Sequence, residues 1–117
     1  MEYNTAQPIY LQVMDAIKRD IVTGKLKPGD KLPSVRDLAI LYTINPNTLS
    51  RVYKELEAEG VCFTRRGMGT FVTEEGKKVQ MMKEEMAQTL INEFLEGMKQ
   101  LGFSQSEAIE ALKKEDQ

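Results

Sequence analysis

Two short helical patterns followed by two β-rich runs occupy the middle of the chain and constrain its fold most. Residues 34–41 carry apolar side chains at helical spacing, and a second such pattern begins at Asn45 and ends at Gly60. The β-rich runs 61–64 and 70–73 follow, joined by five residues that include two arginines and two glycines. Helix, turn, helix and hairpin in this order are typical of a winged helix-turn-helix, a mostly α-helical fold with a small β wing (α+β).

A longer helix is predicted before this segment. Pro8 stands where helices favour proline, Gly24 supplies a stop, and the apolar residues between them recur every three or four positions. These residues are Ile9, Leu11, Val13, Met14, Ile17, Ile21 and Val22. Residues 27–30 (KPGD) have the composition of a turn, and the two residues after them predict a minimal strand.

Capping residues indicate where both short helices begin. Ser34 is a good N-cap, and Asp37 three residues later approximates a capping box. Asn45 is also an N-cap type, and Pro46 follows at the first helical position, where a backbone N–H is not needed. The second helix of the pair, residues 46–59, therefore has a defined start.

The helix predicted for residues 46–59 has two different sides, since successive residues rotate by about 100°. Its apolar side carries Leu49, Val52, Tyr53 and Leu56, which should pack. The opposite, polar side carries Asn47, Arg51 and Lys54, which should face outward. In a major groove Asn bonds adenine, Arg bonds guanine, and the first turn of such a helix supplies the contacts. Asn47, Thr48 and Arg51 are placed for this task.

Two further features favour a nucleic-acid backbone as partner. The free N–H groups and positive dipole end at residues 45–48 can bind a phosphate without a cationic side chain. The loop 65–69 (RRGMG) carries two cations, and its glycines permit turns and a close approach to another backbone. We therefore expect this wing to lie in or beside a groove.

Composition bounds the remaining possibilities. A chain of 117 residues can form one moderate core, or a small domain with an appendage. One cysteine, Cys62, and no histidine leave no internal disulfide and no Cys/His zinc set, and no cofactor is expected. No long apolar stretch and no signal-peptide pattern is present, so a cytoplasmic location is expected.

The net charge of −2 hides two parts of opposite sign. Residues 1–73 hold ten Lys and Arg against eight Asp and Glu, whereas residues 74–117 hold six against ten. The N-terminal part is therefore the better polyanion binder, although phosphate binding depends on where the cations cluster.

Residues 7–73 resemble the DNA-binding domain of the GntR superfamily, specifically its short YtrA-like branch. The resemblance depends on long motifs: Pro8-Ile9-Tyr10 with Gln12, residues 24–36 (GKLKPGDKLPSVR), Leu38-Ala39, residues 45–48 (NPNT), Tyr53, Leu56-Glu57, Glu59-Gly60, and the wing residues 65–67 and 69–72. Residues 41–44 and Cys62 depart from what such members usually carry, without threatening DNA binding.

The resemblance implies which residues touch operator DNA. They lie after the Pro-Ser motif, at the start of the recognition helix and at the wing tip: Arg36, Asn45, Asn47, Thr48, Arg51, Arg65, Arg66 and Gly67. Ser34 is included with them, and Ser50 and Lys54 are added as weaker candidates.

Each of these candidates has a simpler alternative. Arg36 can be a solvated cation paired with a carboxylate, and Asn45 can be a helix cap alone. Arg65 and Arg66 can be charges that block edge pairing of the hairpin. Cys62 is expected to be a packed small hydrophobic residue, with a redox-sensing role as the minor alternative.

Beyond residue 73 the pattern predicts two helices, so we divide the chain into domains 1–73 and 74–117. Gly102 ends the first, long amphipathic helix, and Ser104 with Glu107 opens the second with a capping box. Two helices cannot bury so wide an apolar surface alone, so we expect a helical hairpin that dimerises with a second copy. The expected contacts are Met82, Met86, Leu90, Phe94, Met98 and Leu101.

Two alternatives for this arm stay open. The helices can instead fold back on their own winged domain. The methionines can form an adaptable ligand surface, because methionine repacks easily, although a small-molecule effector between subunits has no support in the sequence.

The sequence thus predicts a homodimeric transcription factor that binds a palindromic operator, with helix 46–59 in the major groove and wing 65–69 on the adjacent groove or backbone. Repression by occlusion is the expected mode, and the resemblance implies a transporter-type operon as the target. A protein-docking winged helix is the main rival. An enzyme is not expected, because the carboxylates are scattered and no nucleophile stands beside a base.

Overall fold

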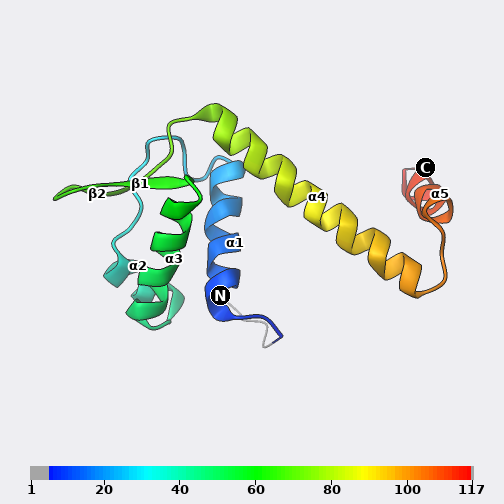
Figure 1. Cartoon of the computed structure of the whole chain (residues 1–117), viewed down its shortest axis with the longest axis horizontal. Coiled ribbons are helices and arrows are strands. Elements are labelled where there is room, and N and C mark those ends of the chain that lie inside the picture. The colour runs from blue at the N-terminus through cyan, green and yellow to red at the C-terminus, as the bar shows by residue number, and fades with distance from the viewer. Residues whose placement is uncertain (1–5, 117) are drawn as a thin grey trace. The chain divides into compact units, whose positions relative to one another are not determined.

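The structure is a computed structural model that describes residues 6–116 and divides into two compact units, the first ending at Met82 and the second beginning at Lys83. The first unit contains α1 (Ile9–Val22), α2 (Val35–Tyr42), α3 (Pro46–Ala58), β1 (Cys62–Arg65) and β2 (Gly69–Val72). The long helix α4 (Gly76–Gln100) continues from the first unit into the second, and α5 (Gln105–Glu115) follows (Figure 1).

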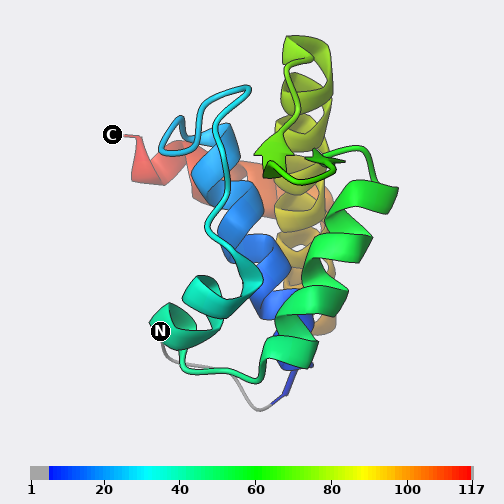
Figure 2. The ribbon, with the colours of Figure 1, turned by 90° about the vertical axis from the view of Figure 1, so that its left-hand side faces the viewer.

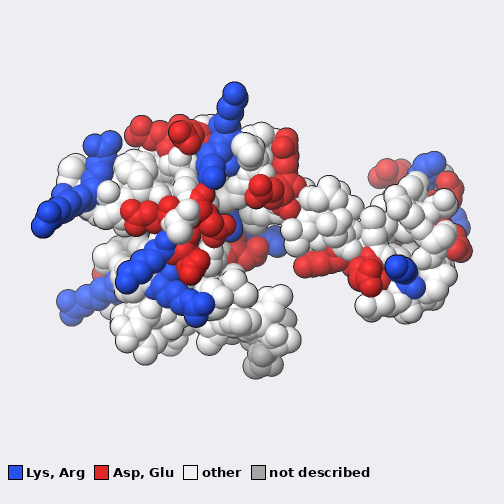
Figure 3. Space-filling view, in the orientation of Figure 1, with Lys and Arg blue, Asp and Glu red and all other residues white. Residues whose placement is uncertain are grey.

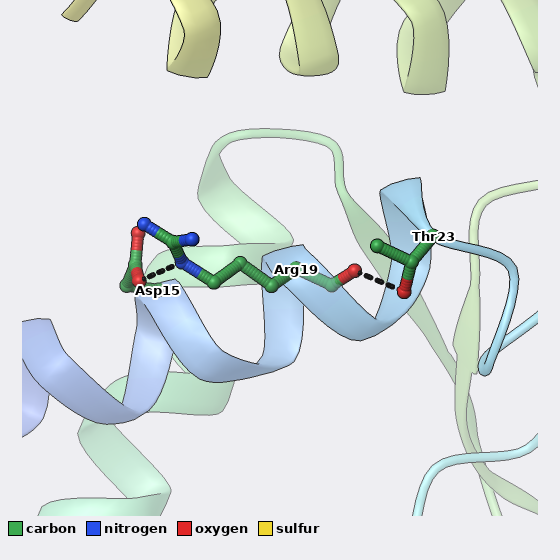
Figure 4. Close-up of polar contacts among 3 residues, drawn as sticks. All are labelled: Asp15, Arg19 and Thr23. Carbon is green, nitrogen blue, oxygen red and sulfur yellow. Dashed lines mark hydrogen bonds and ion pairs between the residues drawn. The ribbon is translucent and has the colours of Figure 1, made fainter. Parts of the chain in front are cut away.

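Helix α1 has the bounds that its apolar spacing predicts. Val13, Met14, Ile17 and Ile21 are buried, and α1 lies beside α3 (Figure 2). Lys18 pairs with Glu59 just beyond α3 at 2.8 Å. Toward its C-terminus, Arg19 pairs with Asp15 at 2.5 Å and its carbonyl accepts the Thr23 hydroxyl at 2.7 Å (Figure 4). Thr23 is the C-cap of α1, and Gly24, with a positive φ of 85°, follows as the predicted stop.

The helix-turn-helix is formed by α2 and α3, and both predicted caps are confirmed. The Ser34 Oγ accepts the backbone N–H of Asp37 at 3.1 Å, and the Asn45 Oδ1 accepts that of Asn47 at 2.8 Å. Helix α2 ends at Tyr42, and its C-cap, Thr43, has a left-handed backbone with φ of 56°. Such a conformation is unfavourable for a residue with a Cβ, so the surrounding turn must impose it.

The predicted hairpin is present, with each strand displaced one residue toward the loop. Cys62 faces Val72 and Arg65 faces Gly69 in an antiparallel register. The loop itself therefore spans residues 66–68. The minimal strand predicted after residue 30 is an isolated bridge between Lys31 and Phe71, supported by the N–H of Leu32 donating to the Thr70 carbonyl at 2.8 Å.

The first turns of α4 belong to the first unit. Met82 is only 7% exposed, and the Lys78 Cε lies 3.2 Å from where a Cβ on Gly60 would be. The predicted boundary after residue 73 coincides with the link between β2 and α4, whereas the compact units divide within α4.

The second unit contains the rest of α4 and α5. Gly102, with φ of 90°, lies in the connection, and Ser104 and Glu107 form both bonds of the predicted capping box at 3.2 and 3.0 Å. Among the residues of α5, all of which are described, only Ala108 is buried. Large apolar side chains consequently stay open to solvent on this unit.

Candidate nucleic-acid interface

One face of α3 is polar and open to solvent. Asn47, Arg51 and Lys54 are all exposed on it. The opposite face is completely buried, with 0% exposure at Leu49, Val52 and Leu56. The predicted orientation of this helix is confirmed, so side chains that match base and phosphate chemistry point away from the core.

The N-terminal turn of α3 is open at the same face. Its backbone N–H groups are partly satisfied, since Asn45 caps that of Asn47. Thr48 and Ser50 are half-buried. The role of Asn45 as a cap is confirmed, and its contact with DNA stays a prediction.

The beginning of α2 forms a groove with the wing. Ser34 and Arg36 are exposed at the start of α2. A groove of about 590 Å³ separates this helix start from the wing strand and is lined by Lys31, Leu32, Pro33, Ser34, Asp37, Met68, Gly69 and Thr70. The positive dipole end of α2 and the cation of Lys31 favour an anion here, whereas the Asp37 carboxylate, which also lines the groove, opposes one.

The wing projects its two arginines into solvent. Arg65, Arg66 and Gly67 are exposed, and Gly67 has a positive φ of 78°. The Arg65 Cζ lies 5.4 Å from the centre of the Phe63 ring, which itself stacks on Phe71 at 5.7 Å. The aromatic pair thus supports the base of the wing.

The first residue of β2, Gly69, cannot carry a side chain without strain. Its φ of 121° disfavours a side chain, and a Cβ there would lie 2.8 Å from the Lys31 Cε. Glycine therefore lets Lys31 pass close over the wing.

A buried phenol connects α3 to the start of α2. The Tyr53 hydroxyl donates a hydrogen bond to the Pro33 carbonyl at 2.5 Å. Burial, and to a smaller extent the neighbouring Cys62, raises the pKa of Tyr53 above its ordinary value. The hydroxyl therefore keeps its proton and its hydrogen bond even above pH 10, and this bond joins the middle of α3 to the segment that leads into α2.

The cations of this face have no carboxylate partner in residues 6–116. The ion pairs of that part of the chain join Lys18 to Glu59, Arg19 to Asp15 and Lys113 to Glu110. None of them involves the interface cations Arg36, Arg51, Lys54, Arg65 and Arg66. Lys and Arg side chains project around the β1–β2 loop at the left of Figure 3. Arg36 therefore has no ion-pair partner within residues 6–116, which argues against the alternative that it only pairs with a carboxylate.

The sequence that forms this arrangement matches a known protein family. Residues 9–72 match the family model described as bacterial regulatory proteins, gntR family. The chain belongs to the GntR family. The helix-turn-helix, the wing and the exposed polar face of α3 all lie within the matched GntR residues.

Named relatives agree with this membership. The chain is 44% identical over 100 residues to the HTH-type transcriptional repressor YtrA of Bacillus subtilis, covering 80% of this chain and 77% of YtrA. A GntR family transcriptional regulator from Listeria monocytogenes has a similar structure, with a TM-score of 0.88, 37% identity, and coverage of 96% of this chain and 98% of that one. The protein is thus a DNA-binding transcriptional regulator of the GntR family.

A third likeness bears on the ligand. The DNA-binding domain of AraR, in a crystal structure with operator ORX1, matches 57% of this chain and 81% of its own, with a TM-score of 0.55 and 30% identity. GntR regulators therefore include members seen bound to operator DNA.

Three residues near the GntR interface were missed by sequence reasoning. Lys31 lines the groove beside the wing, Met68 is 60% exposed at the wing tip, and Tyr10 of α1 stacks against Arg51. Lys31 was detectable as a cation three residues before Ser34. The Tyr10 contact joins residues 41 positions apart, and no local pattern indicates it.

Among residues 6–116, Cys62 is the single cysteine. Cys62 is buried, and burial raises the pKa of its thiol to about 11, so it is a packed thiol at neutral pH. No cluster of His, Cys, Asp or Glu in this described range could hold a metal. No helix there is long and apolar enough to cross a membrane.

The residues predicted for dimerisation lie in three different environments. Leu90, Phe94 and Leu101 are exposed, with Leu101 open to 74%. Met86 and Met98 are half-buried. Met82 is buried in the first unit, where its own chain already covers it.

Proposed function

We propose that this GntR regulator is a repressor that binds a palindromic operator as a homodimer in the cytoplasm. The observation that carries the proposal is the face of α3, where Asn47, Arg51 and Lys54 are exposed and the cations lack carboxylate partners within residues 6–116. Arginine and asparagine there supply the donors that read guanine and adenine in the major groove.

The remaining contacts position the protein on the duplex. Arg36 and the start of α2 bind phosphate beside the groove that α3 enters. Arg65, Arg66 and Gly67 of the wing lie on the adjacent groove or backbone, where cations are attracted by the phosphates. Base readout is thus assigned to α3 and register to α2 and the wing.

A homodimer fits the unpartnered apolar surface of the second unit. Leu90, Phe94 and Leu101 are exposed there, together with Ile109 and Leu112 of α5. An apolar surface of this kind is unfavourable in water, and a second copy covers it with the same residues. Two-fold symmetry then requires a two-fold operator, with half-site centres about 34 Å apart or a multiple of that.

The mode and the target are inferred from the relatives. YtrA is named a repressor, and operator occlusion needs no surface beyond those described. The target proposed by resemblance is a transporter-type operon. A protein-docking winged helix is the competing function, and it predicts binding through apolar rather than phosphate contacts.

The experiment is a gel shift of the full chain on its own promoter region across salt concentrations from 50 to 200 mM, with the stoichiometry determined. Several phosphate contacts predict an affinity loss of about 10³-fold or more over that range. A selective, salt-sensitive complex with two chains per site supports the proposal. Selective binding that ignores salt, or none at all, contradicts it.

A further inference from the structure

We propose that Tyr10 of α1 is a positioning residue that holds the Arg51 guanidinium for operator readout. The inference rests on the proposed function, because it assigns how one cation of the α3 face is aimed at DNA. The Arg51 Cζ lies 3.7 Å from the centre of the Tyr10 ring, which places the cation directly over the aromatic face.

The contact joins the first turn of α1 to the N-terminal half of α3. Helices α1 and α3 lie side by side and run in the same direction, so Tyr10 at the second position of α1 lies near the first turns of α3 (Figure 2). Arg51 follows Asn47 by four residues and therefore lies one turn further along the same face. Tyr10 is half-buried and Arg51 is exposed, so the ring lies between the guanidinium and the body of the domain.

The backbone that carries Tyr10 is itself anchored. The side-chain amide of Gln12 donates to the Gln7 carbonyl at 3.0 Å, and the Pro8 carbonyl accepts the N–H of Leu11 at 3.2 Å. Since these bonds fix the first turn of α1, the ring has a defined place against α3. Because Arg51 stacks on this ring, the position of its guanidinium is restrained as well.

Stacking leaves the donors of Arg51 free. A guanidinium presents its five N–H groups in its own plane, and the 3.7 Å between the Arg51 Cζ and the centre of the Tyr10 ring is a distance typical of face-to-face stacking. No ion pair within residues 6–116 uses those donors. Arg51 is therefore restrained in direction while its fork stays available for a guanine edge or a phosphate.

The expected gain is in preorganisation. An exposed arginine loses rotamer freedom when DNA immobilises it, and a side chain already held against a ring loses less. Removing the ring should weaken operator binding by about three- to tenfold, the range that corresponds to ordering one such side chain. It should also reduce discrimination at the base pair that Arg51 reads, while other positions are unaffected.

The test combines substitutions of Tyr10 with Arg51→Ala, using fluorescence anisotropy of the full chain with its operator. Tyr10→Phe keeps the ring and should bind within about twofold of wild type. Tyr10→Leu and Tyr10→Met lose it and should show the three- to tenfold loss. In the Arg51→Ala background the loss should vanish, whereas in a Lys54→Ala background it should remain, because the cation that lies over the Tyr10 ring is that of Arg51.

A second readout needs no DNA. In the free protein, ring currents should shift the side-chain proton resonances of Arg51 upfield in wild type and Tyr10→Phe, and the shift should disappear in Tyr10→Leu. Equal operator affinity of wild type and both ring-less variants overturns the inference and leaves the proposed function standing. A wild type that binds no operator selectively overturns both, and the loss persisting without Arg51 overturns the positioning role alone.

Discussion

The hydroxyl of Tyr53 on α3 donates a 2.5 Å hydrogen bond to the carbonyl of Pro33, the residue just before the N-cap of α2. The bond spans 20 residues of chain and joins the recognition helix to the segment that presents Ser34 and Arg36. A buried phenol thus joins the middle of α3 to the residue just before α2, whose exposed start is proposed to contact DNA.

Removing that hydroxyl should destabilise the first unit. Tyr53→Phe leaves the Pro33 carbonyl without its donor in a part-buried place, which lowers the free energy of unfolding by about 1–2 kcal/mol. Urea denaturation followed by circular dichroism measures this. Tyr10→Phe is the matched control. It also removes one tyrosine hydroxyl, but Tyr10 contacts Arg51 through its ring, which phenylalanine keeps. Equal stabilities of the two variants would show that the Tyr53 bond contributes nothing.

The same region predicts a loss of stability in alkali. Burial raises the pKa of Cys62 from 9.0 to about 11 and that of Tyr53 above its ordinary 10.0. Both neutral forms are favoured by folding, so their contribution is complete below about pH 9 and is lost as the pH rises through the folded pKa values. The free energy of unfolding should fall between pH 9 and about 11, and less steeply in Cys62→Ala. If the free energy of unfolding fell with pH as steeply in Cys62→Ala as in wild type, the thiol would not contribute to the loss.

Operator binding should depend on Arg36 and Asn47. Arg36→Ala and Asn47→Ala each remove an exposed side chain from the α2 and α3 starts, and both should abolish detectable operator binding in a gel shift while the dimer survives sedimentation. Arg19→Ala is the matched control, because that arginine is exposed but paired with Asp15 on α1. If either interface variant bound like Arg19→Ala, the assigned contact would be wrong.

Asn45 offers a way to separate its cap from a DNA contact. Asn45→Ala removes the bond to the Asn47 N–H and should lower the unfolding free energy by about 1 kcal/mol. Asn45→Ser retains a capping oxygen and should keep the stability of wild type. Operator affinity of the serine variant then reports on the amide alone: a decrease shows that Asn45 touches DNA, and no change shows that it is only a cap.

Much of the fold was predictable because its determinants are local. The caps at Ser34, Asn45 and Ser104 and the proline at 46 act within one helical turn, and the structure places each as expected. The apolar side of α3 is visible in the spacing of four residues and is buried. Helix caps and apolar spacing depend on residues that are close together in the chain, so they can be predicted from the sequence.

What sequence missed depends on contacts between distant residues. Nothing in the sequence near Thr43 predicts its left-handed backbone, because the turn between α2 and α3 imposes it. Met82 has the same helical spacing as the exposed Leu90, and only the packing of the first turns of α4 distinguishes them. The stacking of Tyr10 on Arg51 likewise requires α1 and α3 to be side by side.

Assembly should depend on the apolar surface of the second unit. Leu90 and Phe94 are one turn apart on α4 and exposed, so a lysine at either site places a charge where the proposed dimer buries apolar surface. Leu90→Lys and Phe94→Lys should shift the chain to a monomer in sedimentation equilibrium.

Gln88 is a matched control, since it is exposed on the opposite side of α4, 200° from Leu90 in helical rotation at about 100° per residue. Gln88→Lys adds the same charge and should leave the assembly unchanged. Because each monomer keeps its intact α3 face, the monomeric variants should still bind nonspecific DNA while losing high-affinity binding to a palindrome, where two linked half-sites act together. Dimers that persist in both lysine variants would place the interface elsewhere and would separate the operator chemistry of α3 from the surface of α4.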